Sequence, residues 1–139
     1  MIFHVNRLTF RAEVDDHTRT LALDRLRRQG SEIDAMTTAV VGPDIGGEYE
    51  WGAVFAVEDL QDYWEYLEHP VHFESVKFGL PLIDQFVSFD ITDNHDPDIA
   101  ERIAQLHKRS YEQNSELAEL VAGVPQFAAG AVPEETPPA

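Results

Sequence analysis

Cysteine is absent from the 139-residue sequence, so the chain can form no disulfide, which fits a cytoplasmic protein. Long apolar runs are absent too: none reaches the roughly 18 residues that a transmembrane helix needs, and we expect no membrane partner. The first residues lack the basic and then apolar plan of a signal peptide. Basic residues are few, because 10 Lys and Arg stand against 26 Asp and Glu, giving a formal net charge of −16. A chain this acidic repels phosphate backbones, so we expect no nucleic-acid partner.

Glycine-rich phosphate loops are also missing, since neither a GxGxxG nor a GxxxxGK spacing occurs. The apolar residues, at 43% of the chain, are enough for one core, and the length suits a single domain. The composition changes near the C-terminus, where residues 124–139 hold half of the 8 prolines together with small residues. We therefore expect a folded domain over residues 1–93, a helical extension over 94–123 and a disordered tail over 124–139.

The pattern of apolar residues predicts a β-α-β-β-α-β order of elements. Alternating or β-branched segments predict strands over residues 2–10, 35–41, 49–57 and 86–91. Right-handed crossovers turn this order into a four-stranded antiparallel sheet with two helices on one face, the ferredoxin-like α+β fold. Capping and breaking signals predict one helix from Asp15 or Asp16 to Gln29, ended by Gly30, a second after Asp59, and an extra C-terminal helix from Asp96-Pro97.

One face of such a sheet remains uncovered within a single chain. It would carry Phe3 and Val5 on the first strand, and Val54 and Ala56 on the third. Burying these side chains against a second copy of the chain is an economical solution. We therefore expect a homodimer formed through the β-sheet face.

The densest polar motif is Tyr66-Leu67-Glu68-His69-Pro70-Val71-His72-Phe73. The apolar spacing before it is typical of a helix, and Pro70 should end that helix and start another, with His69 at the cap. His72 then lies in the first turn, where the helix dipole favours the neutral imidazole, and on one stripe with Val76. A neutral histidine beside a tyrosine is an acid–base pair, which makes His72 and Tyr66 the candidate catalytic residues.

Further polar groups lie outside this motif. His4 and Asn6 are on an otherwise apolar strand face, where they are either hydrogen-bonded core residues, which the pattern slightly favours, or pocket walls. Tyr63 has the helical spacing of a core residue. His107 lies among charged residues, so we expect its ring to be solvated.

These features resemble the stress-responsive A/B barrel (Dabb) domain family over about residues 2–92. The resemblance rests on His4, the strand over 49–57, the motif over 66–72 and its continuation over 76–82. It implies a homodimer whose two sheets close into a dimeric α/β barrel with the helices outside. Among enzymes, the sequence is similar to polyketide cyclases of the olivetolic acid cyclase type, which work without a cofactor.

The resemblance also implies roles for individual residues. The tyrosine–histidine pair of the cyclases falls on Tyr66 and His72, and two of their pocket histidines match His4 and His69. A further pocket histidine of the cyclases is replaced here by Trp51. The helix predicted after residue 95 has no counterpart in the cyclases.

The leading hypothesis is a cofactor-independent small-molecule enzyme that catalyses a polyketide-cyclase-like aldol, cyclisation or proton-transfer reaction, a lyase-type activity. His72 would take a proton alpha to a carbonyl, and Tyr66 would orient His72 or donate to the developing enolate. No metal or cofactor is expected. The small hydrophobic or polyketide-like ligand would be bound by His4, Asn6, Trp51, His69 and Val76.

Two other hypotheses stay open. One is a non-catalytic, stress-responsive ligand-binding homodimer, in which His69-Pro70 caps a kinked helix and His72 and His4 are hydrogen-bonded core residues. The other is a metal site formed by His4, His69 and His72, because histidine is a common ligand of zinc and copper. Pro70, between His69 and His72, changes the directions of their side chains, and no cysteine is available as a further ligand. The metal site is therefore the weaker of these two hypotheses.

Overall fold

The structure is a computed structural model, and it describes residues 1–129. Among these residues, none of the helices has both the length and the apolar character that crossing a membrane requires. In chain order the elements are β1 (Ile2–Phe10), α1 (Asp16–Glu32), β2 (Thr38–Pro43), β3 (Trp51–Val57), α2 (Leu60–Glu68), α3 (Pro70–Gly79), the 3-10 helix η1 (Leu80–Leu82), β4 (Ile83–Thr92), α4 (Ile99–Gln113), α5 (Ser115–Ala122) and β5 (Gln126–Ala129).

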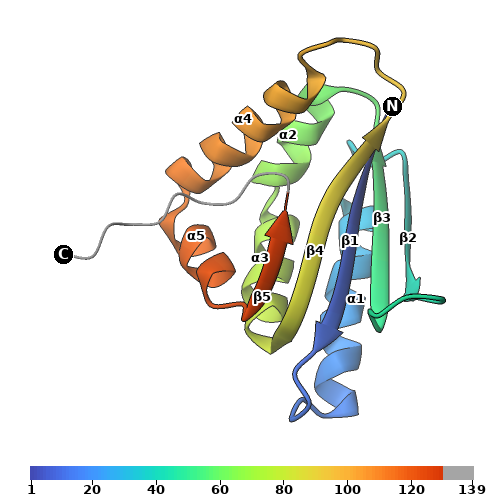
Figure 1. The fold of residues 1–139 in the computed structure, drawn as a ribbon, viewed down its shortest axis with the longest axis vertical. Coiled ribbons are helices and arrows are strands. Elements are labelled where there is room, and N and C mark those ends of the chain that lie inside the picture. The colour runs from blue at the N-terminus through green and yellow to red at the C-terminus, as the bar shows by residue number, and fades with distance from the viewer. Residues whose placement is uncertain (130–139) are drawn as a thin grey trace.

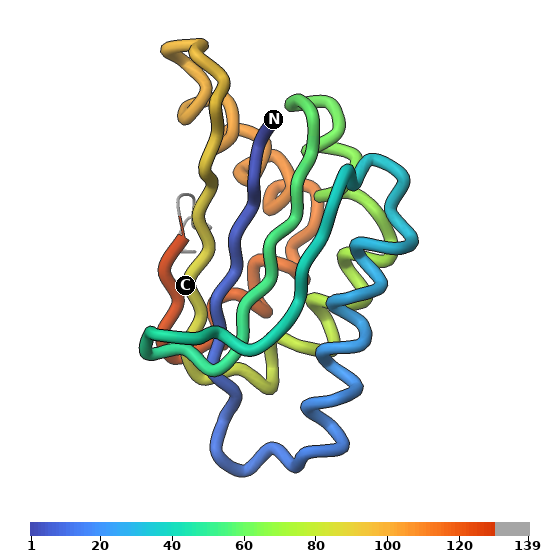
Figure 2. Tube along the Cα trace, turned by 90° about the vertical axis from the view of Figure 1, so that its right-hand side faces the viewer, coloured from blue at the N-terminus to red at the C-terminus, as the bar shows by residue number. Residues whose placement is uncertain are grey.

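The strands form one sheet in the order β2-β3-β1-β4-β5. β1 pairs antiparallel with both β3 and β4, and β2 pairs antiparallel with β3. β5 adds a short parallel edge to β4. The helices cover one face of the sheet (Figure 1), and the opposite face is turned to the viewer in Figure 2. The expected ferredoxin-like α+β fold is confirmed, with β5 as an addition that the sequence patterns do not predict.

The core lies between the sheet and the helices, in two clusters of apolar side chains. One cluster packs Leu8 and Phe10 of β1 against Leu23 of α1, and it also includes residues of α5. The other packs Ile2 of β1 with Ile103 of α4. Both C-terminal helices therefore share the core of the preceding domain.

The break between α2 and α3 follows from the local sequence. The Asp59 carboxylate caps α2 by accepting a hydrogen bond of 2.9 Å from the N–H of Asp62. His69 ends α2 and caps α3, because its Nδ1 accepts a hydrogen bond of 3.1 Å from the N–H of Val71. Pro70 occupies the start of α3, where a missing N–H costs no helical hydrogen bond. The predicted cap and helix start are confirmed.

Several expected boundaries differ from the structure: β2 and β3 begin later than expected, β4 is longer at both ends, and the C-terminal helix α4 begins at Ile99. Two further differences have a clear structural reason. The sequence predicts that Gly30 ends α1, but the helix continues to Glu32. A Cβ atom at Gly30 would collide with the Cβ of Ala39 on β2, so this glycine allows α1 to approach the sheet closely. The sequence also predicts a disordered tail from residue 124, but residues 126–129 form β5 on the free edge of β4. Residues 130–139 of that expected tail lie outside the described residues.

The uncovered face of the sheet is apolar. Phe3 and Phe89 are each 38% exposed, and Ile91 is 60% exposed. The register places Phe3 beside Ile91 and Val5 beside Phe89, so one continuous patch crosses β1 and β4. Ala56, which we expect on this exposed face, is instead fully buried, since its small side chain lies beside Phe3 in the register.

Candidate active site

A cavity of about 120 Å³ lies between the helix-covered face of the sheet and the surrounding helices. The register of β1 and β4 pairs His4 with Asp90 and Asn6 with Ser88, so polar side chains gather at one end of its floor. Toward the other end, the lining is apolar and belongs to the core. That part of the lining includes Leu8, Phe10, Leu23, Leu80, Ile83 and Val121.

Tyr66 of α2 and His72 of α3 meet at the polar end of this cavity. Their ring centroids are 4.5 Å apart, and the ring planes are inclined by 54°. Both side chains are buried, and the Tyr66 ring also lies 5.6 Å from the ring of His4. The helix break at Pro70 separates the two residues along the chain, and the packing of α3 against α2 brings them together. The two candidate catalytic residues therefore line one cavity.

His72 is held by the backbone. Its Nδ1–H donates a hydrogen bond of 3.0 Å to the carbonyl oxygen of Leu67, which leaves the lone pair on Nε2. Burial lowers the pKa of His72 to about 3, although the hydrogen bond to Leu67 acts in the opposite direction. The imidazole is therefore neutral near pH 7, and the main cause is desolvation rather than the helix dipole.

Tyr66 is a protonated phenol, because burial raises its pKa and the nearby Asp90 carboxylate adds to the effect. The Asn6 side chain hydrogen-bonds the Tyr66 hydroxyl and lowers that pKa, so the Asn6 amide is the donor. The Asn6 Oδ1 atom is buried without a hydrogen-bond partner among the described residues, and so is the Oε1 atom of Gln29 on α1. Both residues line the cavity. Unpaired acceptors at this place favour a ligand or water that donates hydrogen bonds.

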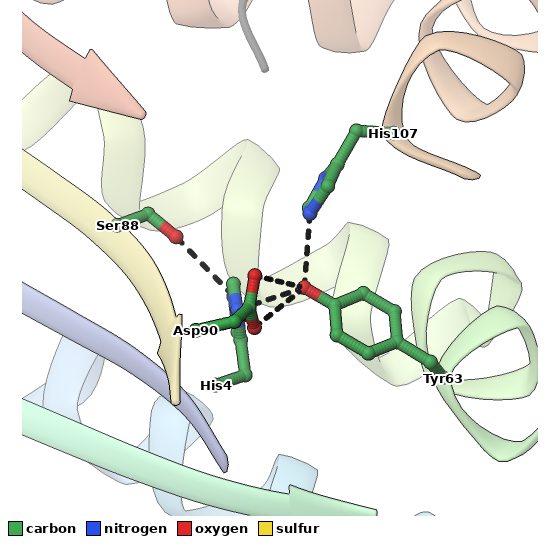
Figure 3. A network of polar contacts seen from close by, with 5 residues as sticks. All are labelled: His4, Tyr63, Ser88, Asp90 and His107. Carbon is green, nitrogen blue, oxygen red and sulfur yellow. Dashed lines mark hydrogen bonds and ion pairs between the residues drawn. The ribbon is translucent and has the colours of Figure 1, made fainter. Parts of the chain in front are cut away.

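A second polar cluster lies at the same end of the cavity and consists of His4, Tyr63, Asp90 and His107 (Figure 3). The Tyr63 hydroxyl oxygen is 2.9 Å from His4 Nδ1 and 2.9 Å from His107 Nε2. The two carboxylate oxygens of Asp90 are 3.0 and 3.2 Å from the same hydroxyl, and one of them is 2.9 Å from His4 Nδ1. The cluster therefore joins β1, α2, β4 and α4.

The sequence patterns do not predict this cluster. We expect a solvated His107, but burial lowers its pKa to about 4 and its side chain lines the cavity, so that expectation is wrong. A signal was present, because His107 follows Ile103 by four residues and precedes Ser110 by three, on the buried side of α4. On β4, Ser88 and Asp90 alternate with apolar residues that face outward, which places these two polar side chains inside.

The structure brings most of the predicted site residues together and leaves two outside. His69 lies outside the cavity lining, and its ring is engaged with the N–H of Val71 as a helix cap. Trp51 also lies outside the lining and packs against the apolar core cluster. Neither side chain is placed to contact a ligand in this cavity. The predicted residues that line it are His4, Asn6, Tyr66, His72 and Val76.

The alternative metal site of His4, His69 and His72 does not form. The Nδ1 atoms of His69 and His72 are engaged in hydrogen bonds to the backbone. Within residues 1–129, the set of His, Asp and Glu side chains whose donor atoms are close enough to share an ion is His4, Asp90 and His107. The candidate ligands therefore lie on β1, β4 and α4, away from the junction of α2 and α3.

The fold and the cavity define a small ferredoxin-like α+β domain with a pocket, polar at one end and apolar at the other, between its sheet and its helices. The family model described as the stress responsive A/B barrel domain, Dabb, matches residues 2–93, and the chain belongs to this family. The resemblance stated from the sequence is thereby confirmed. α4, α5 and β5 follow the matched residues, so His107 comes from beyond them. A search of curated proteins gave no match.

Solved structures share the fold at low sequence identity. A dimeric ferredoxin-like protein of unknown function from Thermobifida fusca is 18% identical, with a TM-score of 0.60, over 66% of this chain and 89% of that chain. A hydroxynitrile lyase from Passiflora edulis is 12% identical, with a TM-score of 0.61, over 68% of this chain and 94% of that chain. SnoaB, a cofactor-independent oxygenase from Streptomyces nogalater, is 10% identical, with a TM-score of 0.54, over 69% and 95%. At these identities the likeness shows the fold alone.

Proposed function

We propose that this protein is a cofactor-independent small-molecule enzyme in which Tyr66 and His72 perform acid–base chemistry on a carbonyl compound. The observation that carries the proposal is the contact between a neutral imidazole and a protonated phenol inside a cavity. Proteins of the same fold include a hydroxynitrile lyase and a cofactor-independent oxygenase, so the fold supports catalysis in other chains.

The two side chains have separate roles in the proposed reaction. The Tyr66 O–H donates to the substrate carbonyl oxygen and stabilises the charge that develops as the enolate forms. His72 Nε2 takes the proton from the carbon alpha to that carbonyl, while Leu67, rather than Tyr66, orients the ring through Nδ1–H. The enolate carbon then attacks a second carbonyl of the same molecule, and the imidazolium returns its proton to the new alkoxide. This sequence is an intramolecular aldol reaction of the polyketide-cyclase type.

The lining of the cavity supports a neutral, hydroxylated ligand with an apolar part. The unpaired acceptors of Asn6 and Gln29 would receive hydrogen bonds from ligand hydroxyl groups. No Lys or Arg within the described part of the chain lines the cavity, which disfavours a phosphate or a carboxylate as the bound group. A polyketide-like compound combines the required carbonyls, hydroxyls and hydrocarbon.

A non-catalytic ligand-binding protein is the second candidate function, and the environment of His72 favours it. A general base is most effective when its pKa lies near the working pH, whereas burial lowers the pKa of His72 to about 3. As a weak base, His72 would contribute to ligand binding through Nε2 as a hydrogen-bond acceptor. The same cavity residues would then select a ligand without transforming it.

The proposal includes a homodimer in which the uncovered sheet faces of two chains pack together. The continuous apolar patch around Val5 and Phe89 supports this arrangement. The structurally similar protein from Thermobifida fusca is described as dimeric. Two sheets packed in this way would form the dimeric α/β barrel that the sequence resemblance implies.

The test of the enzyme assignment incubates the full chain with linear poly-β-keto thioesters of increasing tail length. Cyclisation is followed by the absorbance of the aromatic product, which forms when the aldol adduct loses water and enolises, and by chromatography with mass detection. Loss of a general base lowers a rate by about 10²–10⁴-fold, so His72→Phe and Tyr66→Phe should each abolish most of the turnover. Tyr49→Phe and His95→Gln are matched controls, because both residues lie outside the cavity lining.

The outcomes separate the two candidate functions. Full turnover in both cavity variants overturns the catalytic assignment. Probes that raise the Tm of the wild-type protein without being turned over favour the binding function, provided that the cavity variants lose the Tm shift. A large loss of stability in His72→Ala with an unchanged ligand response assigns His72 a purely structural role.

A further inference from the structure

The cluster of His4, Tyr63, Asp90 and His107 is not used by the proposed acid–base reaction, and its composition suits a cation. The Asp90 side chain is only 17% exposed, and its carboxylate lies within hydrogen-bonding distance of the Tyr63 hydroxyl and of His4 Nδ1. No cationic Lys or Arg side chain from residues 1–129 lines the cavity beside it. A largely buried negative charge is costly unless a positive group or a metal ion pairs with it.

We propose that His4, Asp90 and His107 form a binding site for one divalent transition-metal ion of the Zn²⁺ type. Their ligand atoms, namely an imidazole nitrogen from each histidine and a carboxylate oxygen, all lie within 4.8 Å of one another. Ligands that hold Zn²⁺ at about 2.0–2.2 Å in a tetrahedral site are about 3.4 Å apart. Small side-chain adjustments would therefore bring all three donors onto one ion.

The donor set selects the class of ion. Two imidazoles and one carboxylate suit Zn²⁺, Fe²⁺ and related ions, whereas Mg²⁺ and Ca²⁺ take oxygen ligands. The Tyr63 hydroxyl, 2.9 Å from both histidine nitrogens, supplies a further oxygen beside the ion. This hydroxyl can donate one hydrogen bond and accept two, but four polar atoms lie close around it. A cation in the cluster would accept lone pairs from the hydroxyl, from both histidines and from the Asp90 carboxylate.

Neighbouring groups support the ligands. His4 Nε2 lies 3.4 Å from the Ser88 hydroxyl oxygen, and donation from Nε2–H to Ser88 would aim the lone pair of Nδ1 at the ion. A second hollow, of about 320 Å³, is lined by Asp90 and His107 together with residues of α4. Two of the three proposed ligands therefore border a hollow that Tyr66 and His72 do not line.

The proposed site depends on the C-terminal extension of this chain, because the extension supplies His107. The residue lies on α4, beyond the residues 2–93 that match the family. The site therefore requires α4 to pack beside β4, and the proposal does not depend on the chemistry assigned to Tyr66 and His72.

The test measures Zn²⁺ bound to the full chain after removal of any affinity tag and treatment with a chelator. Elemental analysis after dialysis against Zn²⁺ should give one ion per chain, and added Zn²⁺ should raise the Tm. His107→Ala and Asp90→Asn should each weaken binding by at least tenfold and remove the Tm rise. His17→Ala and His95→Ala are matched controls that remove exposed histidines outside the cluster, and both should bind like the wild type.

Two results would overturn the proposal. One is wild-type protein that holds well below one Zn²⁺ ion per chain, and the other is equal binding by the wild type and the two cluster variants. Either result leaves the cluster as a hydrogen-bonded network. Co²⁺ gives a second readout on the unmutated chain, because its visible bands report coordination by nitrogen and oxygen. If circular dichroism shows that His107→Ala is unfolded, His107→Gln replaces it. No turnover is measured, so the outcome is separate from that of the enzyme assay.

Discussion

The Nδ1–H of His72 donates a hydrogen bond of 3.0 Å to the carbonyl oxygen of Leu67 across the joint between α2 and α3. In an unbroken helix that carbonyl would accept from the N–H of Val71, four residues on. Here the N–H of Val71 bonds to His69 Nδ1 instead, because Pro70 begins a new helix. The imidazole therefore satisfies a carbonyl at the end of α2 and also lines the cavity, so a change at His72 should affect both the stability of the fold and the candidate site.

This coupling predicts that acid destabilises the fold through His72. Burial lowers its pKa to about 3 in the folded chain, against about 6.5 in the unfolded chain. Between these values the unfolded chain binds the extra proton, so stability rises with pH and falls as the pH drops below about 6.5. The slope from this residue approaches about 1.4 kcal/mol per pH unit. Urea unfolding between about pH 5 and 7 should show a shallower slope for His72→Gln than for the wild type.

The control for this measurement is His95→Gln, which changes an exposed histidine and should keep the wild-type slope. Glutamine at position 72 retains an N–H that can reach the Leu67 carbonyl, so the comparison isolates the titration from the hydrogen bond. Identical slopes for the wild type and His72→Gln would contradict the assignment of a buried, neutral imidazole.

A second prediction concerns the uncovered sheet face. Phe89→Lys places a charge in the middle of the apolar patch, beside Val5 in the register. Burying an unpaired charge is costly, so the dissociation constant of the dimer should rise by at least about a hundredfold. Analytical ultracentrifugation of the wild type and the variant measures this change. Ile45→Lys is the matched control, because Ile45 is 91% exposed and lies in the loop between β2 and β3. A wild-type protein that sediments as a monomer at high concentration would refute the dimer.

The local part of the site could be predicted from the sequence because its causes are local. Pro70 has no N–H and is suited to a first helical position, and the His69 side chain reaches a backbone N–H two residues on. The inward direction of His72 follows from its spacing to Val76 on the same helix. Alternation and helical periodicity likewise predict the order of the first strands and helices.

The remaining part depends on packing that no short window of sequence records. His107 meets Tyr63 and Asp90 because α4 packs against α2, and this placement is a property of the whole fold. β5 forms because β4 leaves a free edge beside it, which depends on the order of strands in the sheet. Its four residues, Gln126–Ala129, are too few to give a clear alternating pattern.

A third prediction tests the close approach of α1 to the sheet. Alanine favours a helix over glycine by about 1 kcal/mol, yet Gly30→Ala should destabilise the protein. The added methyl group would collide with Ala39, and overpacking costs about 1–3 kcal/mol, so after the gain in helix propensity the net loss should be up to about 2 kcal/mol. Chemical denaturation measures the difference. Gly79→Ala is the matched control, because nothing lies within 4 Å of a Cβ atom there and the change should be neutral or stabilising.

The rescue of Gly30→Ala by Ala39→Gly makes this prediction specific. Removing the methyl group of Ala39 frees the space that the new Cβ atom needs, so the double variant should recover most of the lost stability. A double variant that is as unstable as the sum of the two single variants would show that steric contact between α1 and β2 is not the cause.

The last prediction concerns the ion pair that fixes the loop after β2 to β1. Arg7 Nε donates to one carboxylate oxygen of Asp44 at 2.6 Å, and a second Arg7 nitrogen donates to the other at 2.9 Å. The hydrogen bond from Arg7 lowers the pKa of Asp44, so folding favours the ionised carboxylate. The resulting stability is fully present above the unfolded pKa of about 3.9 and is lost as the pH falls through the lowered folded value.

Asp44→Asn should therefore cost about 1–3 kcal/mol of unfolding free energy at pH 7 and clearly less once the carboxyl of the wild type is protonated. Urea unfolding at neutral pH and at about pH 2–3 measures both values. Asp24→Asn is the matched control, since Asp24 pairs with Arg27 at the exposed surface and should cost under about 1 kcal/mol at either pH. A loss of the same size at both pH values would show that Asp44 stabilises the loop through hydrogen bonding alone, because a charge contribution must disappear when the charge does.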